Sequence, residues 1–146
     1  MEVTGKRGSI SAISAISKSG FLLFELHDGR INSDKVIEFL EKMRKQHPNR
    51  HLYIFMDNAP VHTANKIKDY EEKHKKIHIE NIPRYWPKYN PDEFVWNYLK
   101  NVEMNVYSAS DKEDLKEMVT KKLEKIASCT KTLKGIFYRC KLAFHL

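Results

Sequence analysis

Two acidic residues, Asp57 and Glu93, stand where carboxylates could bind a metal ion. Asp57 follows the apolar run at residues 52–56, which is typical of a buried strand, and Glu93 lies in an apolar helical pattern that opens at Asn90-Pro91. The 35 residues between the two acids hold a helical pattern and then a second strand pattern. Because a parallel crossover of this kind returns the chain beside its starting strand, we expect both carboxylates at one rim of a sheet, where α/β folds bind ligands.

Each carboxylate also has a purely structural interpretation. Asp commonly ends a strand and forms an Asx turn, and the Asn-Ala-Pro sequence at residues 58–60 fits such a turn after Asp57. Glu93 lies three residues after Asn90, so its side chain could bind the Asn90 backbone amide in a capping box. Asp92 is the alternative to Glu93 as the site acid, because an offset of one residue changes which side chain faces the sheet. The residues alone leave these interpretations open.

Two ordered motifs identify a family resemblance. The first is the strand followed by Asp57-Asn58-Ala59-Pro60-Val61-His62, and the second runs from residue 82 to residue 96 as IPRYWPKYNPDEFVW. Their order and spacing resemble the catalytic domain of DDE-superfamily transposases, in particular the bacterial and archaeal insertion-sequence transposases related to the mariner group. The chain departs from the family pattern at Trp86 and Tyr89, where Ser and Leu are usual, and neither position carries the chemistry.

The resemblance implies a fold and an activity. The fold would be α/β, a ribonuclease-H-like mixed sheet flanked by helices, and the activity would be metal-dependent DNA strand cleavage and transfer. Asp57 and Glu93, with Asp92 in reserve, would be catalytic residues that hold two Mg²⁺ or Mn²⁺ ions about 4 Å apart. Carboxylate oxygens suit this role because Mg²⁺ is a hard cation. The partner would be DNA, as both transposon ends and target.

Four further side chains are candidates for contacts with nucleic acid. His62, five positions after Asp57, could contact DNA or a water near the metals, or could pack on its neighbours at the start of a helix. Arg84, Lys88 and Lys100 flank Glu93 and could bind phosphate. For each of these three, a solvated surface charge is the favoured interpretation.

The family's first catalytic Asp has no counterpart here. The resemblance places that Asp on a first strand, upstream of a segment resembling residues 3–7, and the element order of this chain lacks that strand. We therefore expect an incomplete domain that is inactive alone, or that is complemented by another chain supplying the strand, or that works as a homodimer. The alternatives are a non-catalytic DNA-binding or assembly remnant of a transposase and, less in keeping with the motifs, another ribonuclease-H-like nuclease.

The remaining patterns predict an alternation of strands and helices. Residues 9–17 and 21–26 indicate an antiparallel hairpin, and residues 77–82 a strand. Helices are expected from Asn32 or Ser33 to His47, over residues 63–76, from Pro91 onward with Trp96 packed inside, and after a capping box at residues 110–113. Residues 131–146 suggest a short terminal helix or a docked tail.

Length and composition limit the domain number, the partners and the location that the chain is expected to have. At 146 residues the chain is expected to form one domain, residues 1–146, and 26 Lys and Arg against 19 Asp and Glu give a net charge of +7, which permits phosphate binding. Two cysteines without metal-site spacing favour a reduced compartment. Neither a signal peptide nor a membrane span is evident. The expected location is the cytoplasm of a prokaryote, at the nucleoid when the protein is bound to DNA.

Overall fold

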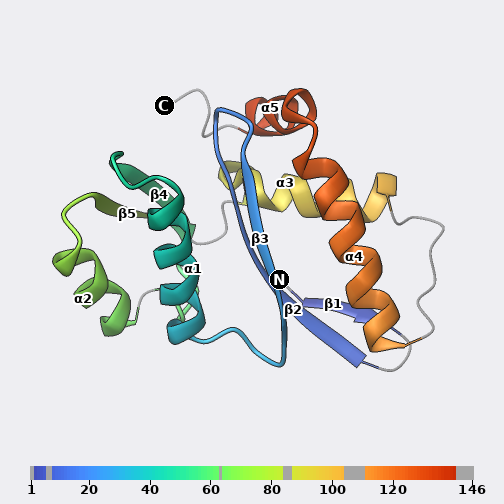
Figure 1. Ribbon diagram of the computed structural model, residues 1–146, viewed down its shortest axis with the longest axis horizontal. Helices are drawn as coiled ribbons and strands as arrows, with labels where there is room; N and C mark the ends of the chain where they lie inside the picture. The colour runs from blue at the N-terminus through green and yellow to red at the C-terminus, as the bar shows by residue number, and fades with distance from the viewer. Residues whose placement is uncertain (1, 6–7, 63, 84–86, 104–110, 141–146) are drawn as a thin grey trace. The chain divides into compact units, whose positions relative to one another are not determined.

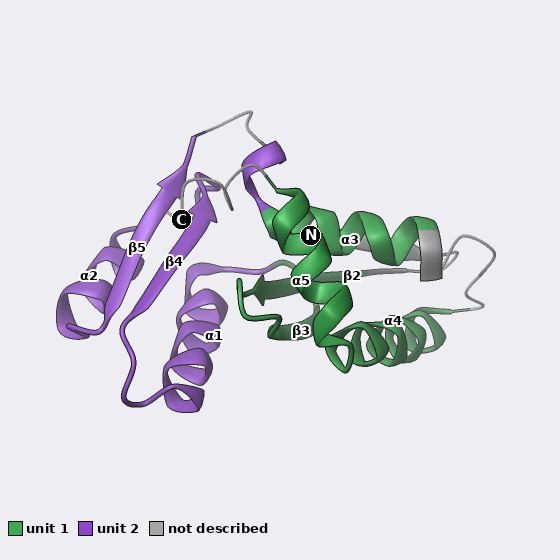
Figure 2. Cartoon of the chain, turned by 90° about the horizontal axis from the view of Figure 1, so that it is seen from above, with its two compact units in different colours: residues 1–30, 91–146 green, residues 31–90 purple. Residues whose placement is uncertain are grey.

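The chain folds as two compact units. The computed structural model describes residues 2–5, 8–62, 64–83, 87–103 and 111–140. Unit 1 comprises Met1–Arg30 and Pro91–Leu146, and unit 2 comprises Ile31–Asn90 (Figure 2). The one-domain expectation for residues 1–146 stays a prediction.

Unit 1 contains an antiparallel sheet in the order β1-β2-β3, formed by β1 (Glu2–Gly5), β2 (Gly8–Ile16) and β3 (Leu22–Asp28) (Figure 1). The predicted hairpin of β2 and β3 is confirmed, with Ile16 opposite Leu22 beside the turn. Strand β1 was not predicted, since residues 3–7 were expected to follow a strand rather than to form one. The missed signal was the spacing of Gly5 and Gly8, which pair across a two-residue connection as in a tight hairpin.

Three helices complete unit 1. They are α3 (Pro91–Tyr98), which continues as a π-helical turn over Leu99–Glu103, then α4 (Lys112–Ala127) and α5 (Thr130–Arg139). Helices α3 and α4 contact the sheet, and α5 contacts both of them. Side chains from β2, β3 and the helical segments share one hydrophobic core, which includes Ile10, Leu22, Val95, Trp96, Leu99, Leu115, Val119, Leu123, Leu133 and Ile136.

One detail of the helix predictions is corrected, and one of two predicted alternatives is confirmed. Helix α4 takes Asp111 as its N-cap, one residue after the predicted Ser110, and the Asp111 side chain accepts a hydrogen bond from the Asp114 backbone N–H at 2.8 Å. Ser and Asp cap helices about equally well, so the sequence did not distinguish them. Ser110 itself lies outside the described residues. The terminal segment includes a true helix, α5, of which Leu133, Ile136 and Phe137 are buried.

Unit 2 contains the predicted parallel crossover. Its elements are α1 (Ser33–Gln46), β4 (Leu52–Asp57), α2 (Asn65–Lys73) and β5 (Ile77–Ile82), followed by a 3₁₀ turn over Pro87–Tyr89. Strands β4 and β5 pair in parallel, with Leu52 opposite Ile77 and Asp57 opposite Ile82. Asn32 is the N-cap of α1 and accepts a hydrogen bond from the Lys35 backbone N–H at 2.9 Å. The crossover from Asp57 back to a neighbouring strand is therefore confirmed.

Strand β4 is less enclosed than its apolar sequence suggested. It was expected to be buried on both faces, but Tyr53 is 67% exposed and Ile54, Phe55 and Met56 are only partly buried. Within the described residues β4 pairs only with β5, and Tyr53 stacks on His78 of that strand with ring centroids 4.6 Å apart. The faces of a strand are buried by the elements that pack on them, and the apolar run alone does not specify that cover. Helix α2 is also shorter than the predicted residues 63–76.

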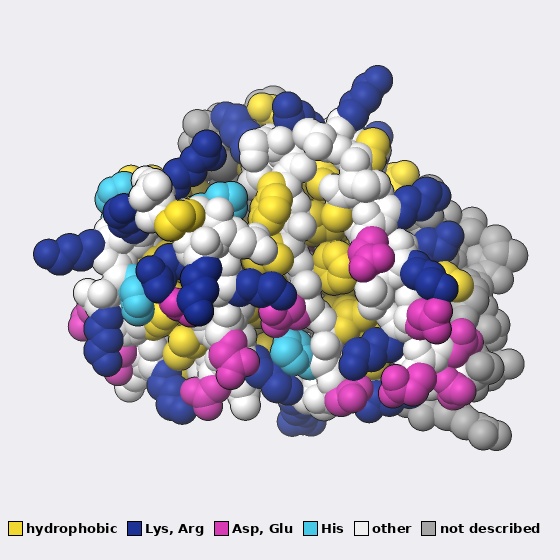
Figure 3. Space-filling model, in the orientation of Figure 1, with side chains coloured by type: hydrophobic (Ala, Val, Ile, Leu, Met, Phe, Trp, Pro, Cys, Tyr) yellow, Lys and Arg dark blue, Asp and Glu magenta, His cyan; other side chains and the backbone are white. Residues whose placement is uncertain are grey.

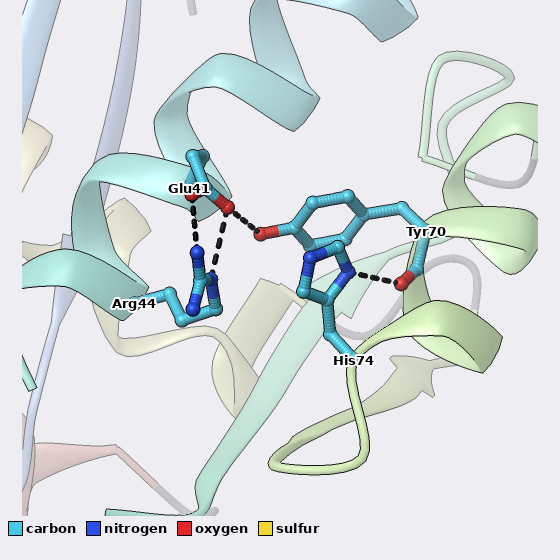
Figure 4. Close-up of polar contacts among 4 residues, drawn as sticks. All are labelled: Glu41, Arg44, Tyr70 and His74. Atoms are coloured by element: carbon cyan, nitrogen blue, oxygen red, sulfur yellow. Dashed lines mark hydrogen bonds and ion pairs between the residues drawn. The ribbon is translucent and has the colours of Figure 1, made fainter. Parts of the chain in front are cut away.

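A polar cluster joins α1 to α2 (Figure 4). Arg44 donates two hydrogen bonds to the carboxylate of Glu41 on the same helix, and the hydroxyl of Tyr70 on α2 donates to the same carboxylate at 2.7 Å. The ring of His74 stacks on Tyr70 and contacts its backbone carbonyl. The Arg44 hydrogen bonds lower the pKa of Glu41 to about 2, while burial raises the pKa of Tyr70 to about 12.

The surface of the protein is mixed in charge. On the face shown in Figure 3, Lys and Arg side chains of unit 2 are interspersed with acidic ones, and acidic side chains gather over the N-terminal end of α4. None of the described helices is both long enough and apolar enough to cross a membrane.

Candidate carboxylate site

Asp57 stands at the end of β4, where two successive turns fold the chain back toward its side chain. The backbone N–H of Ala59 donates to Asp57 Oδ1 at 3.0 Å, which closes the predicted Asx turn. The backbone N–H of His62 then donates to the Ala59 carbonyl at 2.8 Å, a turn that has Pro60 at its second position. Proline is favoured at this position because its ring fixes φ near the value that the turn requires. The two turns return the chain to Asp57 after five residues.

His62 makes direct contact with Asp57. Its Nδ1 lies 2.7 Å from Asp57 Oδ1 and 3.3 Å from the Asp57 carbonyl oxygen. The Asp57 carboxylate therefore accepts both hydrogen bonds, from the Ala59 backbone N–H and from the His62 ring, on the same oxygen, Oδ1. Within the described part of the chain, Oδ2 has no hydrogen-bond partner.

The electrostatics favour an ionised Asp57. The hydrogen bond from His62 lowers the pKa of Asp57, and the Ala59 amide acts in the same direction. Partial burial opposes them, but the carboxylate side chain is still 53% exposed. A charged, solvent-facing carboxylate with one unengaged oxygen is a suitable ligand for a hard divalent cation.

Glu93 and Asp92 occupy the first turn of α3 but have different surroundings. Glu93 is exposed, and among the described residues its carboxylate makes no hydrogen bond or ion pair. The capping-box contact with the Asn90 amide, which the sequence left open, is not formed. Asp92 instead accepts a hydrogen bond from the Ser14 hydroxyl on β2, whose oxygen lies 2.8 Å from each carboxylate oxygen.

The Asp92 contact is part of a network that ties α3 to the sheet of unit 1. The Ser14 hydroxyl oxygen also accepts the indole N–H of Trp96 at 2.9 Å, and Trp96 is 1% exposed. Burial raises the pKa of Asp92 to about 6, with the charge of Glu93 adding to the rise and the Ser14 hydrogen bond opposing it. This network gives Asp92 a structural task and leaves Glu93 as the solvent-facing acid of the motif.

The basic candidates are placed only in part. Lys88 lies exposed in the 3₁₀ turn before α3, and Lys100 lies exposed in the π-helical turn after it. Arg84 lies outside the described residues. The structure thus shows that the two lysines before and after Glu93 in the chain are exposed, while a role in phosphate binding stays a prediction.

The structure does not assemble a complete metal site from one unit. Asp57 belongs to unit 2 and Glu93 belongs to unit 1, so the two carboxylates have separate surroundings within their own units. The part of the chain that is described contains no group of three or more His, Cys, Asp or Glu side chains that could hold a metal ion. The donor chemistry at Asp57 nevertheless fits Mg²⁺ or Mn²⁺, because its free oxygen is a hard ligand that faces solvent.

Two contacts of these acids, one with Ser14 and one with His62, were not predicted from the sequence. The bond between Ser14 and Asp92 joins residues 78 positions apart, and no local pattern points to it. The contact of His62 with Asp57 had a local signal, since the Asx-turn sequence and Pro60 together fold five residues into a closed turn.

Comparison with protein families gives a match over most of the chain. The family described as DDE superfamily endonuclease matches residues 1–116, a range that contains both Asp57 and Glu93. No curated protein sequence matches the chain significantly.

Comparison with solved structures gives matches to the Mos1 mariner transposase. Its catalytic domain has a TM-score of 0.75 and 17% identity, covering 97% of this chain and 73% of that one. The same catalytic domain with raltegravir and Mg has a TM-score of 0.76 and 18% identity, covering 97% and 74%. A Mos1 paired-end complex with the left transposon end has a TM-score of 0.71 and 19% identity, covering 94% of this chain and 41% of the transposase. At these identities the likeness confirms the predicted α/β, ribonuclease-H-like fold class, and this chain spans less than half of the transposase in that complex.

Proposed function

Because the chain belongs to the DDE superfamily endonucleases, we propose that it forms part of the catalytic region of a DNA transposase, which cuts transposon ends and joins them to target DNA. The family match over residues 1–116 carries this proposal, because it contains both motif acids. The fold shared with the Mos1 catalytic domain supports it.

The proposed role of the motif acids is to bind metal. Asp57 would offer its Oδ2 atom, which is left free by the turn that engages Oδ1, and Glu93 would offer a carboxylate that makes no hydrogen bond in the described part of the chain. The metal would be Mg²⁺ or Mn²⁺, as a pair, and when bound it would supply an activated water and stabilise the leaving oxygen of the phosphodiester. The Mos1 catalytic domain structure with Mg supports this choice of ion.

DNA is the proposed partner. The Mos1 transposase, which has the same fold, has been solved in a complex with a transposon end. On this chain, Lys88 and Lys100 are exposed residues before and after α3 in the sequence and could neutralise phosphates, and His62 and Arg84 complete the set predicted from the sequence. A second copy of the chain, or another chain that supplies a complementing strand, is a further proposed partner, and light scattering after size exclusion would detect either.

Manganese binding tests the metal role most simply. Electron paramagnetic resonance of free Mn²⁺ measures how much of the ion the protein binds. We expect the wild-type chain to bind Mn²⁺, and we expect Asp57→Ala or Glu93→Ala to weaken this binding at least tenfold. The control is Asp69→Ala, because Asp69 is an exposed carboxylate on α2 that belongs to neither motif. Equal binding by all four proteins would rule out the proposed ligands.

A nicking assay on DNA tests the activity. Strand cleavage that requires Mg²⁺ or Mn²⁺ and is lost in Asp57→Ala would support a nuclease centre on this chain. DNA binding that needs no divalent metal and is unchanged in Asp57→Ala and Glu93→Ala would favour the alternative, a DNA-binding or assembly remnant without turnover.

A further inference from the structure

We propose that His62 is a positioning residue for Asp57. In this role it holds Oδ1 of the carboxylate so that Oδ2 is presented to the metal. The inference rests on the proposed metal-binding function of Asp57 and assigns to His62 a task other than contact with DNA. It predicts that His62 contributes to metal affinity without itself being a metal ligand.

The geometry of the contact supports positioning. The short distance of 2.7 Å joins His62 Nδ1 to the same oxygen that accepts the Ala59 backbone N–H at 3.0 Å. Two donors on one oxygen fix both the rotation of the carboxylate group and the direction in which its other oxygen points. One donor is backbone and the other belongs to a turn closed by the hydrogen bond from the His62 N–H to the Ala59 carbonyl. The constraint is therefore built into residues 57–62.

Two other roles of His62 fit the contacts less well. If His62 were a cation that occupied the metal position, its ring would be expected on the oxygen that the backbone leaves free, yet it lies on the oxygen that Ala59 already engages. If His62 were mainly a DNA contact, its ring would be expected to stand out from the surface. Its side chain is only 22% exposed, whereas that of Asp57 is 53% exposed.

The choice of substitutions follows from the donor atom. Nδ1 is bonded directly to Cγ of His, and the amide nitrogen of Asn is bonded to Cγ in the same way. His62→Asn can therefore keep the hydrogen bond to Oδ1, while His62→Gln places its amide one bond further out and His62→Ala removes the donor. A side chain that orients a metal ligand typically contributes ten- to hundredfold to metal affinity. Because this carboxylate keeps its backbone donor, we expect a loss near the lower limit, about tenfold.

The experiment measures the Mn²⁺ dissociation constant of the full chain by electron paramagnetic resonance, together with the thermal unfolding midpoint. The proteins are wild type, His62→Ala, His62→Asn, His62→Gln, Asp57→Ala and the control His51→Ala. His51 is an exposed histidine of the same unit that contacts His78 rather than an acid. Positioning predicts that His62→Ala and His62→Gln lose about tenfold in affinity, that His62→Asn stays within about threefold of wild type, and that His51→Ala is unchanged.

The outcomes separate this inference from the proposed function. If Asp57→Ala weakens Mn²⁺ binding but His62→Ala binds as well as wild type or more tightly, positioning is wrong while the metal role of Asp57 stands. If Asp57→Ala has no effect, the metal role itself fails, and the inference fails with it. If His62→Asn loses as much affinity as His62→Ala while its unfolding midpoint is unchanged, the hydrogen bond to Oδ1 is not the cause and the inference is overturned.

Discussion

Asp92 and Glu93 are adjacent acids with opposite surroundings, and this difference decides which of them is available for chemistry. Successive side chains on a helix point about 100° apart. On α3 one of the two acids therefore turns to the Ser14 hydroxyl of the sheet while the other faces solvent. The sequence alone kept Asp92 as an alternative metal ligand. Its bond to Ser14 gives a physical reason to favour Glu93, which stays a proposal until metal binding is measured.

Asp92, which is partly buried, gives a pH-dependent prediction. The pKa of Asp92 is raised to about 6 in the folded protein, so its favourable contribution to stability is complete below about pH 4 and is lost as the pH rises through 6. Asp92→Asn, which keeps an acceptor for Ser14, should therefore be more stable than wild type at pH 7.5 by about 1–2 kcal/mol, with no such gain at pH 4. Urea unfolding at both values measures this, and an equal difference at the two pH values would show that ionisation of Asp92 is not the cause.

Gly20 gives a second residue-scale prediction. It adopts φ +86°, and a Cβ added there would lie 2.7 Å from Thr130 Cγ2 and 2.8 Å from the Thr130 carbonyl oxygen on α5. Gly29 adopts φ +77° with open space around it, so Gly29→Ala is the matched control for backbone strain alone. We expect Gly29→Ala to cost about 1 kcal/mol of unfolding free energy and Gly20→Ala about 2 kcal/mol or more. Equal losses in chemical denaturation would mean that the turn does not pack closely against α5.

At the scale of elements, the cluster of Glu41, Arg44 and Tyr70 fixes α2 against α1. The Tyr70 hydroxyl is the only atom of α2 that this cluster uses to reach the Glu41 carboxylate. We expect Tyr70→Phe to lower the unfolding free energy by about 1 kcal/mol, the usual net value of a hydrogen bond, since the buried ring remains. Tyr53→Phe is the control, because the Tyr53 hydroxyl makes no hydrogen bond within the described residues. If both variants lost the same stability, the Glu41 contact would not be what joins the helices.

Helices and strands could be predicted from the sequence where the local pattern of apolar and polar residues determines them. The hairpin of β2 and β3 and the parallel pair β4 and β5 follow from apolar runs and connection lengths, as does the start of α1 at Asn32. Strand β1 is short, and its only signal is a pair of glycines. The exposure of Tyr53 could not be read from an apolar run, because burial depends on which other strands and helices cover it.

The candidate site was predictable only in part, for the same reason. The motifs located Asp57 and Glu93, and the turn chemistry of residues 58–60 predicted the Asx turn that the structure contains. Which oxygen of Asp57 is engaged, and why Asp92 faces inward, depend on contacts with His62 and Ser14. The Ser14 contact is set by three-dimensional packing, and the His62 contact by the way two local turns close.

At the scale of the whole molecule, net charge alone says little about function. The chain carries +7, yet on the face shown in Figure 3 the basic side chains of unit 2 are mixed with acidic ones. DNA is proposed as the partner because of the family match and because Lys88 and Lys100, before and after α3 in the chain, are exposed.

The central claim is the proposal that Asp57 and Glu93 both bind the divalent metal, and paramagnetic broadening in an amide NMR spectrum tests it most directly. With substoichiometric Mn²⁺, the claim predicts that signals of residues 57–59 and 92–94 lose intensity together, and that Asp57→Ala abolishes both losses. Broadening confined to the acidic start of α4 at Asp111, Glu113 and Asp114, or a loss near Glu93 that persists in Asp57→Ala, would contradict it.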